Sequence, residues 1–390
     1  MMEETVFVKG VLKMTLSFEQ GPIRPPSEAY SLLLRLTRNC PWNKCAFCRT
    51  YKGKSFSRRS VEEVKEDIDR VVEVSRLVGE VSQRQGYGGE VNGEVLAKIY
   101  ESGQSQFYHV AFWLYHGGRT AFLQDANSLI MKTEDLLEII NYLKKRLPTV
   151  ERITSYARSI TLLRKEIGEL AELGRAGLSR IHVGLESGSD EVLKFIDKGV
   201  TSLQHIDAGR RVKEAGISLS EYVILGMGGQ RWAREHPLDT ARVLNAINPD
   251  FIRLRSLTVV KGTPLHEKMV QGEFIEQSEE DVVRGEKLLI ESLRDIQSSI
   301  VSDHSLNLLE EVKGKLPVDK SGMLAVIDRF LELTGRDKEN FILGKRWGMY
   351  RVLDDMADSS RHARVQEAVD RLSRQGSFLD TISSLKNQII

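Results

Sequence analysis

Three cysteines, Cys40, Cys45 and Cys48, stand in the stretch TRNCPWNKCAFCRTYKGK, and they are the only cysteines of this chain of 390 residues. Their spacing, C-x4-C-x2-C, cannot complete a four-cysteine zinc or iron–sulfur site. A zinc site could recruit a histidine as fourth ligand, although the first histidine after the loop is His109. The other metal interpretation is an iron–sulfur cubane in which one iron lacks a protein ligand, since catalysis needs an open metal position. A chance grouping of unrelated cysteines is the third alternative.

The loop resembles that of the radical S-adenosylmethionine (SAM) enzymes, in which a cluster loop follows the first strand of a partial barrel. Residues 31–37, SLLLRLT, read as a buried strand directly before it. Phe47 stands before the third cysteine, where the family commonly has an aromatic residue. This chain has four residues between the first two cysteines, whereas the commonest family spacing has three. The resemblance is to the branch of the oxygen-independent coproporphyrinogen dehydrogenase and the elongator-like proteins.

This resemblance implies that Cys40, Cys45 and Cys48 hold three irons of a single [4Fe-4S] cluster, and that SAM chelates the fourth. An electron from the cluster would then cleave SAM to a 5′-deoxyadenosyl radical, which abstracts hydrogen from a substrate. It also implies a low-potential electron donor of the ferredoxin or flavodoxin type. A second cluster would need further cysteines, so the methylthiolating and auxiliary-cluster branches are not expected. No cobalamin-binding domain is evident either.

Two further segments match the family at strand ends. In FLQDANSL, residues 122–129, the resemblance implies that Asp125 and Asn127 hold the amino group of SAM; both could instead be plain turn residues. In HVGLESGSDEVLKFIDKG, residues 182–199, it implies that Glu186 contacts the ribose or methionine part of SAM. A buried carboxylate needs a partner, so a structural ion pair is the alternative for Glu186.

Later segments offer weaker candidates. In VILGMGG, residues 223–229, Gly226 and Gly228 could let the backbone lie against an adenine, or could simply form a tight turn. Arg253 and Arg255 alternate along FIRLRS, and Arg255 could pair with a carboxylate of SAM or of the substrate. In SDHSLN, residues 302–307, His304 could contact substrate or transfer a proton, unless the segment is a helix cap.

The elements that would position these residues alternate between strand and helix. Strands are expected over 31–37, 120–124, 152–156, 180–185, 218–225 and 251–259. Helices are expected between them over 60–78, 94–116, 133–146, 162–173, 190–196, 202–214 and 238–246. This alternation predicts an α/β fold, a partial (β/α)6 TIM-type barrel with a C-terminal all-helical extension.

The domain organisation follows from this pattern. We expect an N-terminal segment over 1–29, the core barrel over 30–265, a helical connection packing on the barrel over 266–315 and a C-terminal helical region over 316–390. After residue 262 the pattern predicts helices only, over 279–299, 320–334, 346–357 and 361–374. The tail is expected to close the barrel or to meet a partner.

Composition restricts the class of protein. The apolar content of 41% and formal net charge of +1 describe a globular chain without a global field that would attract nucleic acid or an anionic membrane. No transmembrane run and no signal peptide are evident, and three clustered cysteines form no disulfide framework, so a cytoplasmic location is expected. A nucleic-acid substrate is an alternative, because Lys52, Lys54, Arg58 and Arg59 form a basic run. A non-catalytic iron–sulfur or haem carrier is the other.

Overall fold

The computed structural model describes residues 16–388. The expectation that the N-terminus is no signal peptide concerns residues that lie mostly outside this range. The described chain divides into two compact units. Unit 1 comprises the chain up to Pro41, Gly53–His182 and Glu214–Ile217. Unit 2 comprises Trp42–Lys52, Val183–Lys213 and the chain from Ser218 onward. The domain boundaries expected from the sequence stay predictions.

Unit 1 is built on parallel strands. β1 (Leu32–Arg35) pairs with β4 (Thr120–Gln124), which pairs with β5 (Arg152–Ala157), and the N-terminal part of β6 (Leu178–Glu186) follows in the strand order. A second, two-stranded antiparallel sheet joins β2 (Thr37–Arg38) to β3 (Ser57–Arg58). β2 directly precedes the cysteine loop, so the loop begins close to the C-terminal end of β1 as predicted.

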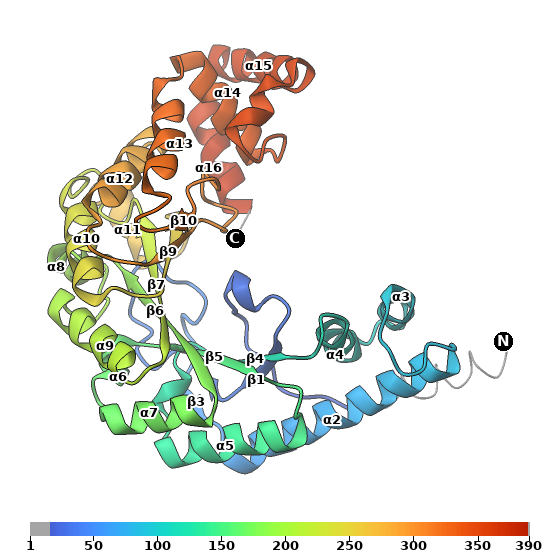
Figure 1. Ribbon diagram of the computed structural model, residues 1–390. Helices are drawn as coiled ribbons and strands as arrows, with labels where there is room; N and C mark the ends of the chain where they lie inside the picture. The colour runs from blue at the N-terminus through green and yellow to red at the C-terminus, as the bar shows by residue number, and fades with distance from the viewer. Residues whose placement is uncertain (1–15, 389–390) are drawn as a thin grey trace. The chain divides into compact units, whose positions relative to one another are not determined.

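Helices of unit 1 begin and end where local chemistry requires it. The first long helix, α2, starts after Ser60, whose side chain accepts from the Glu63 N–H in a capping box. The expectation of a single helix over 94–116 is wrong, because Gly103, at φ +73°, separates α3 from α4. The helices are α2 (Val61–Arg84), α3 (Gly93–Glu101), α4 (Ser105–Tyr115), α5 (Thr133–Arg146), α6 (Ser159–Leu162) and α7 (Ile167–Ala176), and α2 lies beside α5 (Figure 1).

Unit 2 continues the parallel pattern. After the C-terminal part of β6 come β7 (Ser218–Leu225), β8 (Phe251–Ser256), β9 (Ser299–Val301) and β10 (Gly314–Lys315). β8 is parallel to both β7 and β9, and β10 is antiparallel to β9. β9 and β10 contradict the expectation of helices only after residue 262. Strands of three and two residues are too short to show a hydrophobic periodicity in the sequence. They form because β9 pairs with β8 and β10 pairs with β9.

The helices of unit 2 alternate with these strands and form the C-terminal extension. They are α8 (Asp190–Phe195), α9 (Ser202–Glu214), α10 (Glu235–Ile247), α11 (Pro264–Val270), α12 (Glu279–Ser292), α13 (Lys320–Glu332), α14 (Gly335–Arg346), α15 (Ser359–Arg374) and α16 (Phe378–Gln388). The expected helix over 346–357 is wrong: α14 ends at Arg346, and Gly348 has φ +72°. α13 packs against α12, and α14, α15 and α16 pack against one another (Figure 1).

The alternation of parallel strands with helices confirms the predicted α/β class of the TIM-barrel type. Apolar side chains of the strands and of the flanking helices form the core, including Leu32, Leu34, Val223 and Leu254, all buried. None of the helices among residues 16–388 is long and apolar enough to cross a membrane.

A buried acid on α12 makes the stability depend on pH. Glu286 is buried, its Oε1 makes no hydrogen bond among the described residues, and burial raises the pKa of its carboxyl to about 8. The folded chain therefore binds one proton more than the unfolded chain between about pH 4.5 and 8, and this group lowers stability as pH rises through that window.

Glu286→Gln should remove this contribution. The difference in unfolding free energy between variant and wild type should shift in favour of the variant as pH rises, by at most about 1.4 kcal/mol per pH unit. Urea denaturation at pH 5.5 and 8 measures it. Glu291→Gln, on the same helix but partly exposed, is the control. A parallel pH dependence in wild type and Glu286→Gln would show that the carboxyl stays ionised in the folded state.

Candidate functional site

The second half of the cysteine loop is held by backbone contacts within unit 2. The Ala46 N–H donates to the Ile196 carbonyl at 2.8 Å, and the Ala46 carbonyl accepts from the Leu265 N–H at 3.0 Å. The Cys48 N–H donates to the Cys45 carbonyl at 3.3 Å, which closes a turn. The segment from Cys45 to Cys48 is thereby attached both to the end of α8 and to the start of α11.

Phe47 adds an apolar anchor to this segment. It packs with Ala46 against a cluster of buried side chains, whose members are Val192, Ile196, Met227, Leu257, Val259, Leu265 and Phe274. The aromatic residue before the third cysteine therefore holds the loop on the core of unit 2. Contact of Phe47 with a cofactor stays a prediction.

The first half of the loop is organised within unit 1. Asn39, at φ +69°, donates its N–H to Asp125 Oδ2 at 2.9 Å, and Arg35 Nη2 donates to the same oxygen at 2.7 Å. Asp125 is fully buried; burial raises the pKa of its carboxyl, and the Asn39 N–H and Arg35 oppose this. Asp125 thus sets the chain direction immediately before Cys40, and its contact with SAM stays a prediction.

Asn127 is also engaged by the chain itself. Its Oδ1 accepts from the Arg158 N–H at 3.1 Å, and its Nδ2 donates to Thr161 Oγ1 at 2.8 Å. The side chain is buried. These bonds tie the end of β4 to the end of β5, so Asn127 is more than a turn residue, while a role in binding SAM stays a prediction.

Glu186 has a partner that sequence reasoning did not identify. Lys198 Nζ lies 2.8 Å from Glu186 Oε1, and the two side chains are only 11% and 13% exposed, respectively. Glu186 has φ +61°, and a Cβ at Gly184 would lie 2.2 Å from its Oε1. A side chain at position 184 would displace the Glu186 and Lys198 side chains from this arrangement, so the glycine of the motif leaves room for the pair.

The same segment supports the cysteine loop. Trp42 Nε1 donates to the Asp197 carbonyl at 2.7 Å, and a Cβ at Gly199 would lie 2.3 Å from the Trp42 ring. Lys198 lies between Asp197 and Gly199 in the sequence. The turn that presents Lys198 to Glu186 is therefore packed directly on the cysteine loop.

A further pair was missed at the start of the next helix. Ser187 Oγ lies 2.8 Å from His236 Nδ1, and His236 Nε2 lies 3.1 Å from the Ile224 carbonyl. Burial lowers the pKa of His236 to about 4, so the ring is neutral, with Nε2 donating to the carbonyl and Nδ1 accepting from the serine. His236 therefore links Ser187, which follows β6, to the Ile224 carbonyl of β7. Both of its ring nitrogens are engaged in these contacts, so neither is directed at a metal.

Gly226 and Gly228 form a turn after β7. Gly226 has φ +82°, and a Cβ at Gly228 would lie 2.6 Å from the Trp232 carbonyl oxygen. The turn and its close approach to Trp232 account for both glycines. Their contact with adenine stays a prediction.

The structure brings Arg255 and His304 together in unit 2. Arg255 lies over the Tyr222 ring, with its guanidinium carbon 4.7 Å from the ring centroid. Burial and the nearby Arg255 charge lower the pKa of His304 to about 4, so the imidazole is neutral at pH 7. His304 Nδ1 accepts from the Leu306 N–H at 3.3 Å, which leaves Nε2 carrying the proton. Asp303 caps no helix and pairs with Arg253 at 2.9 Å.

Glu221, on β7, was also missed. It is fully buried, and its Oε2 makes no hydrogen bond among the described residues. Burial and the charge of Glu186 raise the pKa of its carboxyl well above the ordinary range, partly offset by Lys198. A lone glutamate in an apolar strand was the sequence signal that could have identified it.

The donor set suits an iron–sulfur cluster. Among residues 16–388, no three His, Cys, Asp or Glu side chains are already gathered as a metal site, so the donor chemistry carries the assignment. Three half-buried thiols stand on one loop, and none is in a disulfide. Three thiolates with no fourth protein ligand in the loop match a cubane with one open iron.

A family model described as "Radical SAM superfamily" matches residues 34–242, more than half of the chain and including all three cysteines. The chain belongs to the radical SAM superfamily. It is therefore an enzyme of a superfamily whose members bind a [4Fe-4S] cluster and SAM, and these two cofactors, expected from the cysteine loop, are confirmed at that level.

Individual relatives of this radical SAM chain match only in part. It is 27% identical over 120 residues to "tRNA uridine(34) acetyltransferase" of Methanocaldococcus jannaschii, which is 30% of this chain and 22% of that protein. It is 27% identical over 191 residues to "tRNA-2-methylthio-N(6)-dimethylallyladenosine synthase" of Alkalilimnicola ehrlichii, 45% of this chain and 42% of that protein. The chain thus spans less than half the length of either curated relative.

A solved structure of the cobalamin-dependent S-adenosylmethionine radical enzyme OxsB, with aqua-cobalamin and S-adenosylmethionine bound, is similar to this chain with a TM-score of 0.46. The two share 16% sequence identity, and the likeness covers 93% of this chain and 56% of that one.

Proposed function

We propose that this radical SAM enzyme cleaves SAM reductively and abstracts hydrogen from an organic substrate, with Cys40, Cys45 and Cys48 as the cluster ligands. The observation that carries the proposal is the C-x4-C-x2-C loop, which follows β1 and β2 in a chain whose residues 34–242 match the family. When bound, the cluster and SAM supply the electron and the 5′-deoxyadenosyl radical. Within this proposal the enzyme is cytoplasmic and receives electrons from a ferredoxin- or flavodoxin-type donor.

The chain's own residues hold and orient these groups. Ala46 and Phe47 fix the second half of the cysteine loop, and Asp125 fixes its first half through the Asn39 N–H. The Glu186 carboxylate is paired with Lys198, so this pair can meet a polar part of SAM without leaving an isolated buried charge. His304, neutral and protonated on Nε2, is the candidate to donate a hydrogen bond to the substrate.

The direct test uses the full chain, reconstituted anaerobically with iron and sulfide. We expect about four irons per chain for one cubane cluster and, on reduction with dithionite, conversion of SAM to 5′-deoxyadenosine. A colourless protein with one bound zinc would exclude this function. A cluster-bearing protein that binds SAM but never cleaves it would support the carrier alternative instead.

The second candidate is modification of RNA, which is favoured because the names of the two curated relatives described above mention tRNA. The basic run supports it only in part. Arg59 is buried and pairs with Asp67 at 2.5 Å, so it is not available to a phosphate, whereas Arg58 and Lys54 are exposed.

The role of Glu186 can be separated from that of its ion pair. Glu186→Gln should weaken SAM binding by about 10- to 150-fold while the cluster still assembles, because a charged hydrogen bond is worth about 1.5–3 kcal/mol. Equilibrium SAM binding and iron content measure the two effects. Asp250→Asn, which removes the charge from the Lys213–Asp250 pair of 2.7 Å, also in unit 2, is the control. Unchanged SAM affinity combined with a lower unfolding temperature would assign Glu186 a structural role.

A further inference from the structure

A cavity of about 400 Å³ adjoins the first half of the cysteine loop within unit 1. It is lined by Gln20, Gly21, Pro22, Arg35, Arg38, Asn39 and Lys54. Three of these residues are cationic, two carry carboxamides, and none of the described lining residues is acidic. Asn39 is the residue directly before Cys40, so the cavity lies where the loop begins.

The carboxylates that hold the two arginines are not among the residues that line this cavity. Glu19 accepts from Arg35 at 3.0 Å and from Arg38 at 2.7 Å, and Glu63 accepts from Arg38 at 2.9 Å. Glu19 and Glu63 both line a second cavity, of about 450 Å³, which Arg38 also borders. The third acceptor, Asp125, is fully buried behind Arg35. The carboxylates therefore fix the guanidiniums without lining the first cavity.

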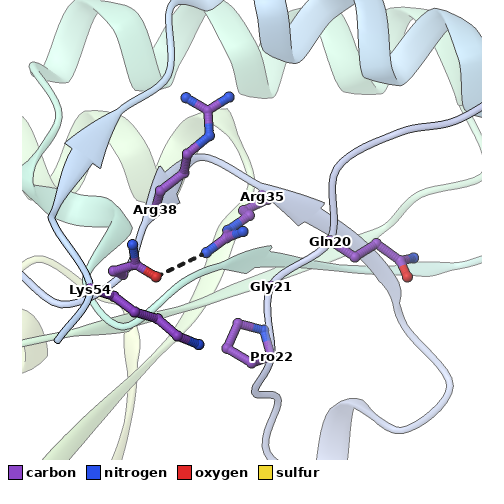
Figure 2. Close-up of a pocket in the computed structure, with 7 residues that line it drawn as sticks. Gln20, Gly21, Pro22, Arg35, Arg38 and Lys54 are labelled. Carbon is purple, nitrogen blue, oxygen red and sulfur yellow. Dashed lines mark hydrogen bonds between the residues drawn. The ribbon is translucent and has the colours of Figure 1, made fainter. Parts of the chain in front are cut away.

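The remaining wall is held in place from β4. Gln124 Oε1 accepts from the Gly21 N–H at 2.8 Å, and Gln124 Nε2 donates to the Ile23 carbonyl at 2.9 Å. Figure 2 shows Lys54 extending toward Pro22, with the guanidinium of Arg35 on the same side of residues 20–22. Residues 21–23 are thus held by the Gln124 carboxamide, and positive charge from Arg35 and Lys54 borders the cavity beside them.

We propose that this cavity binds a phosphate group carried by the substrate. Carboxylates hold both guanidiniums in place, Arg35 through Asp125 and Glu19, and Arg38 through Glu19 and Glu63. The Lys54 ammonium and the remaining guanidinium N–H groups are the type of donor that binds phosphate oxygens in proteins. Placing the phosphate on the substrate rests on the proposed function; phosphate binding itself does not.

Two neighbouring cations make a matched pair for the test. Lys54 lines the cavity, whereas Arg58, four residues further on β3, is exposed and does not line it. Lys54→Gln and Arg58→Gln each remove one positive charge from the same segment. Lys54→Glu reverses the charge and enlarges the effect. Circular dichroism confirms that each variant is folded.

The probes are adenosine 5′-monophosphate, adenosine, glutarate and a short single-stranded oligoribonucleotide, each titrated into the full chain at several salt concentrations. We expect the monophosphate to bind in preference to adenosine and glutarate, and Lys54→Gln to weaken it by about tenfold, the scale of one charged hydrogen bond. Arg58→Gln should change its affinity less than about twofold. If the oligoribonucleotide binds more tightly and with a stronger salt dependence than the monophosphate, and Lys54→Gln weakens that binding as well, the source of the phosphate is an RNA backbone. If the oligoribonucleotide binds no more tightly than the monophosphate, the source of the phosphate is a small nucleotide.

Equal losses in Lys54→Gln and Arg58→Gln would overturn the proposal, because they would show general surface attraction. So would equal binding of glutarate and the monophosphate, or no binding of any phosphate probe. Conversion of SAM to 5′-deoxyadenosine is measured separately on the same variants. If SAM cleavage is absent but Lys54-dependent phosphate binding is present, the proposed function fails and the phosphate site stands; the reverse result rejects the site alone.

Discussion

Replacing any one of Cys40, Cys45 or Cys48 by alanine should abolish the visible absorbance of the cluster and SAM cleavage together. The chain contains no fourth cysteine that could substitute, so each loss leaves two thiolates for a cubane that needs three protein ligands. Iron content, the absorption spectrum and 5′-deoxyadenosine formation, measured on the three variants after anaerobic reconstitution, check the expectation.

Fold and cluster must be distinguished in this experiment. Ser57→Ala, an exposed position on β3 beyond the loop, is handled in parallel and should retain wild-type iron. Far-ultraviolet circular dichroism should be the same in all four variants, since the three cysteines are half-buried and in no disulfide. Iron at the wild-type level in all three cysteine variants would reject the ligand assignment.

The second large effect is expected from Arg346, at the end of α14. Its side chain is fully buried, pairs with Glu279 of α12 at 2.8 Å and donates to the Leu306 carbonyl at 2.8 Å. Arg346→Ala would leave the largely buried Glu279 carboxylate with only Lys386, 3.8 Å away. Removing one member of a buried pair costs about 3–5 kcal/mol, so the unfolding midpoint in urea should fall markedly.

Arg336→Ala is the matched control for this change. Arg336 lies on the same helix and pairs with Asp370 at 2.6 Å, but its side chain is 70% exposed. An exposed pair contributes about 0–1 kcal/mol, so this variant should unfold close to wild type. Equal stability of the two arginine variants would mean that α14 is not part of the folded core of unit 2.

The buried pair bears on the C-terminal extension. Arg346 joins α14 to α12 and to the segment after β9, and β9 itself pairs with β8. The extension is therefore joined to α12 and to the segment after β9 within unit 2. The expectation that it closes the barrel or meets a partner stays a prediction. A buried charge pair between residues 67 positions apart leaves no local mark in a sequence.

Much of the fold and the metal centre was determined by local sequence information. The capping box of Ser60 and Glu63, the apolar strand before the cysteine loop and the alternation of strands with helices depend on neighbouring residues, and the structure confirms them. The spacing of the three cysteines predicted the superfamily for the same reason, because three ligands of one cluster lie close together in the chain.

The tertiary structure alone decided which side chains meet. Lys198 as the partner of Glu186, Asp125 as the residue that directs the chain into Cys40, and the short strand β9 all depend on contacts between distant segments. Hydrophobic periodicity reports which face of an element is buried, but not which residue lies opposite. A polar group on a buried face acquires its partner, and with it its charge state and its role, only when the elements pack.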